Sequence, residues 1–156
     1  MAEAKDTFTI ERKATIGAPA ATVYALVADF HQWGRWSPWE DIDPHMQRTF
    51  SGAESGAGAV YEWSGNRKAG SGRMEITETD EPSVVTIDLQ FLKPFKAHNT
   101  TTFTFDEEAG NTAVRWMMTG PKTFMTKVMG IFKSMDAMVG PDFEKGLTRL
   151  KAAAEG

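Results

Sequence analysis

Apolar and polar residues alternate through most of the chain up to about position 118. Such alternation places successive side chains on opposite faces of a β-strand. The clearest case is residues 84–92, where every second residue from Val85 to Phe91 is apolar. The pattern predicts strands at residues 8–16, 46–50, 59–63, 73–78, 84–92, 100–105 and 112–118.

The segments between these strands set their arrangement. Most connections after position 46 are short turns, and short connections make neighbouring strands antiparallel. Residues 20–27 have a helical pattern after Pro19, and Asp29 can cap a second short helix that ends at about Trp33. The predicted order is one strand, two short helices, about six more strands and a long helix.

Residues 123–154 form the longest stretch with a helical period. Its apolar stripe comprises Phe124, Val128, Ile131, Met135, Met138, Phe143, Leu147 and Leu150. Gly140 followed by Pro141 resembles a helix start and predicts a break or kink there. Gly130 and Gly146 indicate either close backbone packing or a tolerated local weakness.

The predicted fold class is α+β, with a curved antiparallel sheet of about seven strands around the C-terminal helix. Such a sheet is roughly 30 Å wide and a helix only about 10 Å across, so one helix leaves space unfilled. We therefore expect a ligand cavity between them. Its predicted lining is Tyr61, Trp63, Met74, Leu89, Phe91, Phe103, Trp116 and Met118 from the sheet, and Phe124, Val128, Met135 and Met138 from the helix.

Three tryptophans lie close together in the sequence at Trp33, Trp36 and Trp39. Indole combines a large apolar area with one N–H donor, which suits the rim of a pocket. The alternative is that these side chains fasten the short helices to the sheet. The two interpretations are compatible, and both stay open.

Composition narrows the function classes. The chain of 156 residues has no cysteine, which excludes disulfides and thiolate metal ligands, and it is long enough for one domain over residues 1–156. A net charge of −4 with scattered basic residues argues against nucleic-acid binding.

The N-terminus has no signal-peptide pattern and no segment is apolar enough to span a membrane, so we expect a cytoplasmic protein without membrane insertion. The glycosylation motif at Asn99 is then interpreted as a chance match.

Signals for catalysis are sparse. The histidines have no metal-ligand spacing, and the glycine-rich turns lack the Lys-Ser/Thr of a phosphate-binding loop. We predict no metal and no cofactor. Glu78, in phase with Met74 and Ile76, and His98 are the candidates for an inward-facing acid or base.

Several motifs together resemble the SRPBCC superfamily, which has the helix-grip fold, and within it the bacterial polyketide cyclase/dehydrase-like branch. They lie at residues 16–30, at 33–39 (WGRWSPW), at 61–65 (YEWSG), at 70–78, at 91–95 and at 139–151. The resemblance implies a sheet that grips the C-terminal helix around a hydrophobic cavity, with Trp36 and Trp39 at the cavity or its mouth. It transfers no catalytic residue, because fold does not fix function.

The leading hypothesis is a protein that binds a small hydrophobic or amphipathic molecule, either a lipid or an aromatic polyketide. One alternative is a cofactor-independent cyclase or dehydratase acting in the same cavity. Another is a protein-interaction module that uses the outer sheet face or the tryptophan-rich loop. The sequence sets neither the ligand nor the oligomeric state.

Overall fold

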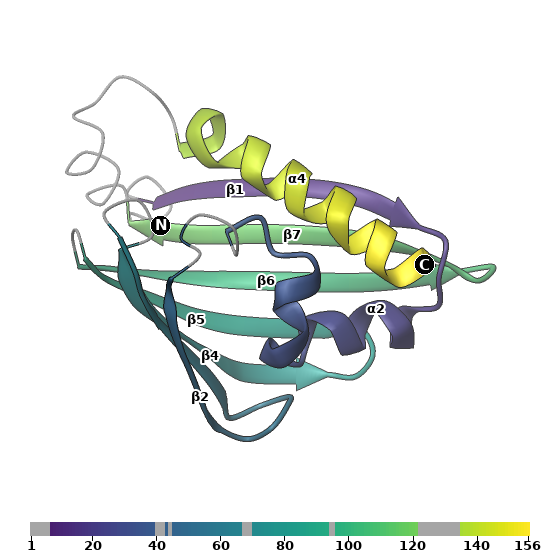
Figure 1. Cartoon of the computed structure of the whole chain (residues 1–156). Helices are drawn as coiled ribbons and strands as arrows, with labels where there is room; N and C mark the ends of the chain where they lie inside the picture. The colour runs from purple at the N-terminus through teal and green to yellow at the C-terminus, as the bar shows by residue number, and fades with distance from the viewer. Residues whose placement is uncertain (1–6, 40–42, 44, 67–69, 94–95, 122–134) are drawn as a thin grey trace.

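The computed structural model describes residues 7–39, 43, 45–66, 70–93, 96–121 and 135–156. Seven strands form one antiparallel sheet in the order β1-β7-β6-β5-β4-β3-β2 (Figure 1). The strands are β1 (Thr7–Ile16), β2 (Gln47–Gly52), β3 (Ala59–Ser64), β4 (Ser71–Asp80), β5 (Val84–Lys93), β6 (Ala97–Glu108) and β7 (Asn111–Pro121). The α+β fold that the alternation predicts, and the helix-grip fold that the family resemblance implies, are thus confirmed.

The helices lie on one face of the curved sheet (Figure 1). They are α2 (Ala20–Val27), the 3₁₀ helix η1 (Phe30–Arg35) and α4 (Met135–Glu155). Helix α4 packs mainly on β1, whereas α2 packs on β5, β6 and β7. The β2–β4 side of the sheet lies away from α4.

The inner face of the sheet is the one that the alternation predicts to be buried. Val85 and Ile87 on β5 and Phe103 on β6 are completely buried, and Trp116 on β7 is 1% exposed. Their neighbours in sequence are more exposed and lie on the outer face. Apolar burial on this single face is the main stabilising contribution that the sheet can make.

Helix η1 is fastened to the end of α2 by tryptophan side chains. Asp29 caps η1 by accepting a hydrogen bond from the His31 backbone N–H at 2.9 Å. Trp33 Nε1 donates to the Val27 carbonyl at 2.9 Å, and Trp36 Nε1 donates to the Leu26 carbonyl at 2.8 Å. These bonds satisfy carbonyls at the end of α2 that have no partner within the helix. Both rings also meet Phe103 of β6 edge-on, at 6.1 Å for Trp33 and 5.8 Å for Trp36, so they connect the short helices to the sheet as the fastening interpretation predicts.

Helix α4 runs without a break from Met135 to Glu155, with Pro141 inside it. Of the break or kink predicted at Gly140, the break is therefore wrong. An internal proline costs roughly 3 kcal/mol, but Phe143, Leu147 and Leu150 are buried along one stripe just after it. Tertiary packing of that stripe outweighs the local signal. Residues 123–134 of the predicted helix, including Gly130, lie outside the described residues.

The described part of the chain contains no helix that is both long and apolar enough to cross a bilayer.

The strands extend beyond their predicted ends, most of all β6, which covers Ala97–Glu108 where 100–105 is predicted. Its added ends pair with β5 and β7. Backbone pairing lengthens the strand beyond the residues that show alternation.

Candidate functional site

The inner face of the sheet divides into two regions, and the first is closed by α4. We call it the aromatic stack, comprising Trp36, Phe103, Trp116 and Phe143. Trp116 lies parallel to Phe143 of α4, with ring centroids 4.1 Å apart, and stacks on Phe103 at 4.8 Å. Trp36 meets Trp116 edge-on at 5.7 Å. Sheet and helix are in direct contact here, so a ligand between them must lie elsewhere along the sheet.

Gly146 of α4 permits this close approach. A Cβ at this position would lie 2.8 Å from the Trp116 ring and 2.9 Å from Pro38 Cδ. Both distances are shorter than ordinary carbon contacts. Of the two interpretations of Gly146, close packing is therefore the one that applies.

The second region lies on β3, β4 and β5. We call it the Trp63 wall, comprising Tyr61, Trp63, Met74, Leu89 and Phe91. Tyr61 is opposite Met74 in the register, and Met74 is opposite Leu89. Trp63 contacts Phe91 edge-on at 5.9 Å across Gly72.

Burial distinguishes the Trp63 wall from the aromatic stack. Tyr61 and Leu89 are buried, but Trp63, Met74 and Phe91 are only partly buried. A Cβ at Gly72 would overlap the Trp63 indole, so glycine lets that ring lie flat against the strand. The wall is a continuous apolar surface with side chains that are not fully enclosed.

Polar side chains interrupt the inner face on β6. Asn99 is 2% exposed and Thr101 is 5% exposed. Within the described part of the chain, Asn99 Nδ2 and Oδ1, Thr101 Oγ1 and Trp116 Nε1 are buried without a hydrogen-bond partner. A buried polar group left unpaired typically costs about 1–3 kcal/mol, so these groups mark a place where stability is given up.

Sequence reasoning missed Asn99 and Thr101 as site residues. The signal was present, because both are in phase with Phe103 and Phe105 on the inward side of β6. A polar residue in an otherwise apolar phase is the pattern that could have found them.

The remaining predicted lining residues fall in different places. Met118 is buried on β7, opposite Thr101. Trp39 is partly buried, packs edge-on against Trp116 at 5.7 Å and donates its Nε1 to Asp142 at 3.4 Å. Phe124 and Val128 lie outside the described residues. Met135 and Met138 belong to α4, but their side chains are outside the described part.

Glu78 and His98 do not face the interior. A register shift between Ile76 and Glu78 breaks the alternation on β4, and Glu78 is exposed. The side chain of His98 is 65% exposed and pairs with Asp88 on the outer face. The inward orientation predicted for these two residues is therefore wrong.

The outer pair changes the titration of Asp88. Burial raises the pKa of Asp88, but hydrogen bonds from Gln90 and His98 and the charges of His98 and Arg73 lower it. Together they hold that pKa below its usual value. Asp88 thus stays ionised on the outer face, away from the apolar interior.

Among the described residues, no group of three or more His, Asp or Glu side chains is placed to hold a metal ion.

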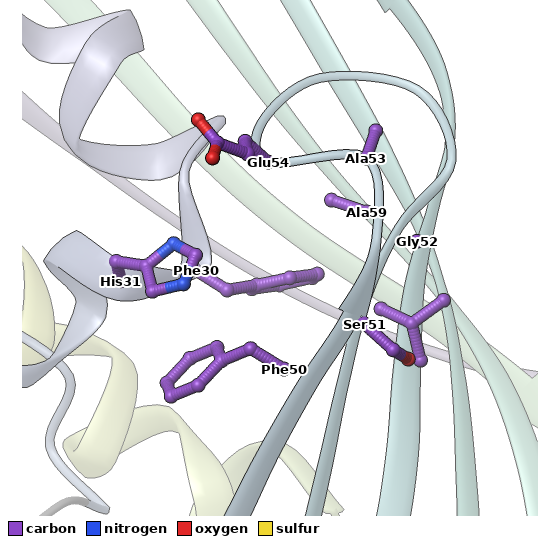
Figure 2. A pocket seen from close by; sticks show the side chains of 9 residues that line it. Phe30, His31, Phe50, Ser51, Gly52, Ala53, Glu54 and Ala59 are labelled. Atoms are coloured by element: carbon purple, nitrogen blue, oxygen red, sulfur yellow. The ribbon is translucent and has the colours of Figure 1, made fainter.

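A pocket of about 160 Å³ opens beside the β2–β3 turn (Figure 2). It is lined by Phe30, His31, Phe50, Ser51, Gly52, Ala53, Glu54, Ala59 and Val60. This volume is below the roughly 300 Å³ of ordinary small-molecule sites, and none of the predicted cavity residues lines it.

Comparison with known proteins gives a family match and structural similarities. The profile of the polyketide cyclase / dehydrase and lipid transport family matches residues 7–155. No curated protein matches the chain in sequence.

Solved structures are similar over nearly the whole chain. Protein CV1439 from Chromobacterium violaceum is 14% identical, with a TM-score of 0.68, over 95% of this chain and 97% of that one. Protein MLL2253 from Mesorhizobium loti is 13% identical, with a TM-score of 0.69, over 95% and 97%. The di-domain ARO/CYC BexL from the BE-7585A biosynthetic pathway is 20% identical, with a TM-score of 0.67, over 96% of this chain and 50% of that one. At these identities the similarity establishes the fold alone.

Proposed function

The chain belongs to the polyketide cyclase / dehydrase and lipid transport family, and from this premise we propose that it binds a small hydrophobic or amphipathic molecule against the Trp63 wall. The observation that carries the proposal is the partial burial of Trp63, Met74 and Phe91 on an inner sheet face. Large apolar side chains in such a position gain free energy when a ligand covers them, at about 25 cal/mol per Å².

The aromatic stack supports this location by exclusion. Trp116 and Phe143 are in contact and buried, so a ligand there would have to separate two packed elements. On the Trp63 wall, by contrast, Trp63, Met74 and Phe91 are only partly buried, so a ligand there can cover side-chain area that is still exposed. The ring and thioether surfaces of the wall also suit ligands of varied shape, because methionine is flexible and aromatic faces stack on flat molecules.

A displacement experiment tests the proposal. We expect the fluorescent probe 1-anilinonaphthalene-8-sulfonate to bind the protein and to be displaced by fatty acids or by polycyclic aromatic compounds. Native mass spectrometry of protein purified from its own host should show a retained small molecule.

Matched variants locate the site. Phe91→Ala removes a ring from the wall, and we expect the Kd for the probe to rise about tenfold. Leu92→Ala is the control, because Leu92 is the next residue and is 50% exposed. It should leave the Kd unchanged. Equal effects of the two substitutions, or no binding by the wild-type protein, would contradict the proposal.

A cyclase or dehydratase activity would need an acid or base beside the bound molecule. The two residues that the sequence suggested, Glu78 and His98, are exposed. No observation on the described residues favours a reaction over binding, so binding is the function we propose. An external docking role for the protein likewise has no specific observation in its favour.

A further inference from the structure

The inner face of β6 carries a pair of neutral polar side chains at the end nearest the Trp63 wall. Asn99 and Thr101 are both more than nine-tenths buried, and their side-chain nitrogen and oxygen atoms have no hydrogen-bond partner within the described part of the chain. Native proteins pair nearly all such groups, so unpaired ones require an explanation. One explanation is a partner that the isolated chain does not contain.

The sheet register places Asn99 beside the apolar wall, and Thr101 follows two residues further along β6. Asn99 is opposite Leu89 of β5, and Phe91 is two residues further along that strand. Thr101 is opposite Ile87 on one side and Met118 on the other. A molecule that lies across Met74 and Leu89 therefore has Asn99 as the next residue in the same row, on the neighbouring strand.

The absence of a side chain at Gly120 of β7 leaves space for the Asn99 amide. A Cβ at Gly120 would overlap Asn99 Oδ1, so the amide lies directly over the glycine. The same Cβ would lie 3.1 Å from the Phe8 ring. A larger residue at position 120 would push the amide from its place.

The chemistry of the pair defines the group it can recognise. An amide offers two donors and an acceptor, and a hydroxyl offers one donor and two acceptor lone pairs. Both are uncharged. Their complement is a neutral group that combines an acceptor with a donor, such as an amide or a carbonyl next to a hydroxyl, and a carboxylate lacks the donor.

We propose that Asn99 and Thr101 form the polar subsite of the ligand site and select molecules that have an apolar body and a neutral hydrogen-bonding end. This inference rests on the proposed function, because the apolar body occupies the Trp63 wall. A site built to hydrogen-bond a substrate group discriminates strongly against analogues that lack it, since its own polar groups are then left unpaired.

Three probes that share a naphthalene ring system test the subsite: naphthalene-2-carboxamide, naphthalene-2-carboxylate and 2-methylnaphthalene. We expect the wild-type protein to bind the carboxamide about tenfold more tightly than either analogue, measured by calorimetry or by probe displacement. Asn99→Leu and Thr101→Val keep the side-chain size but remove the hydrogen bonds. Each should reduce the preference for the carboxamide, and the double variant should abolish it while 2-methylnaphthalene still binds.

Two further variants serve as a control and as an independent test of the subsite. Thr100→Val, on the same strand but exposed, is the matched control and should keep the full preference. Gly120→Ala leaves Asn99 in the sequence but displaces its amide, so it should also reduce the preference. It provides an independent test should Asn99→Leu fail to fold.

Thermal unfolding without ligand separates recognition from a structural role. Because Asn99→Leu removes unpaired buried polar atoms, its melting temperature should equal or exceed that of the wild type. A lower melting temperature with an unchanged preference would assign these groups to internal hydration and overturn the subsite. Binding of all three probes without preference would overturn the subsite and leave the proposed function standing. Absence of binding by every probe would overturn both.

Discussion

The aromatic stack and the Trp63 wall lie on the same inner sheet face and have similar apolar composition, yet they differ in how completely they are enclosed. Trp116 is 1% exposed and Phe143 of α4 is completely buried, whereas Trp63 and Phe91 are only partly buried. Helix α4 packs mainly on β1, which is at the far edge of the sheet from β2. Position relative to α4, more than residue type, therefore separates the two regions.

Because of this difference, similar aromatic residues contribute to folding stability in one region and are available for ligand binding in the other. Complete burial lets an aromatic side chain contribute its full apolar area to the free energy of unfolding. A partly buried side chain contributes less to folding and keeps area that a ligand can cover. The predictions below test whether stability and binding divide between the regions in this way.

The largest expected effect comes from removing a ring of the aromatic stack. Phe143→Ala should lower the free energy of unfolding by about 3–5 kcal/mol, because it removes a buried ring and leaves a cavity. Phe91→Ala should lower it by about 1–2 kcal/mol, because less of that ring is buried. Urea unfolding followed by circular dichroism measures both. Equal losses would remove the distinction between the two regions.

A smaller effect is expected from adding a methyl group to α4. Gly146→Ala should lower the free energy of unfolding by about 1–3 kcal/mol, because the new Cβ meets the rigid Trp116 ring and Pro38. At Gly140 a new Cβ meets the guanidinium of Arg12, which is the flexible end of a side chain.

Gly140→Ala is therefore the matched control for that substitution. Alanine favours a helix by about 1 kcal/mol over glycine, which offsets moving Arg12 from Glu144, its partner at 2.8 Å. We expect its melting temperature to lie close to that of the wild type. A greater loss at position 140 than at position 146 would show that the stack is not the tightly packed region.

The smallest effect is expected on the outer face, away from both regions. Because the pKa of Asp88 is lowered in the folded protein, its ionised form stabilises the fold above the unfolded value of 3.8. That stabilisation is lost as the pH falls through the folded pKa. Asp88→Asn should therefore lower the free energy of unfolding by less than about 1 kcal/mol at pH 6, which gives a small decrease in melting temperature. It should have no effect near pH 2. A difference that grows at acid pH would contradict the assigned direction.

Most of the fold could be predicted from the alternation. Val85 and Ile87, for example, mark the inner face of β5, and the structure buries both. The short helix predicted at residues 20–27 has the same bounds in the structure. These elements are predictable because a half-buried strand or helix must repeat its apolar residues at the period of its own geometry.

The site was less predictable, for reasons visible in individual residues. Trp116 and Trp63 have the same periodicity, and only the placement of α4 makes one a packing residue and leaves the other partly buried. Glu78 faces outward because the register shifts between Ile76 and Glu78 on β4. The alternation of apolar and polar residues does not reveal this shift. Asn99 lies outside the strand predicted at residues 100–105, and it joins the inward phase because β6 begins at Ala97.

The sheet order has a consequence for how the chain is made. Strand β1 pairs along its whole length with β7, and Thr7 is opposite Pro121. The ribosome must therefore release most of the chain before the first strand can find its partner. During that interval β1 has an unsatisfied edge, which is a template for wrong pairing between nascent chains. Pairing between distant parts of a sequence also slows folding, so we expect the pairing of β1 with β7 to be a slow step in the folding of this protein.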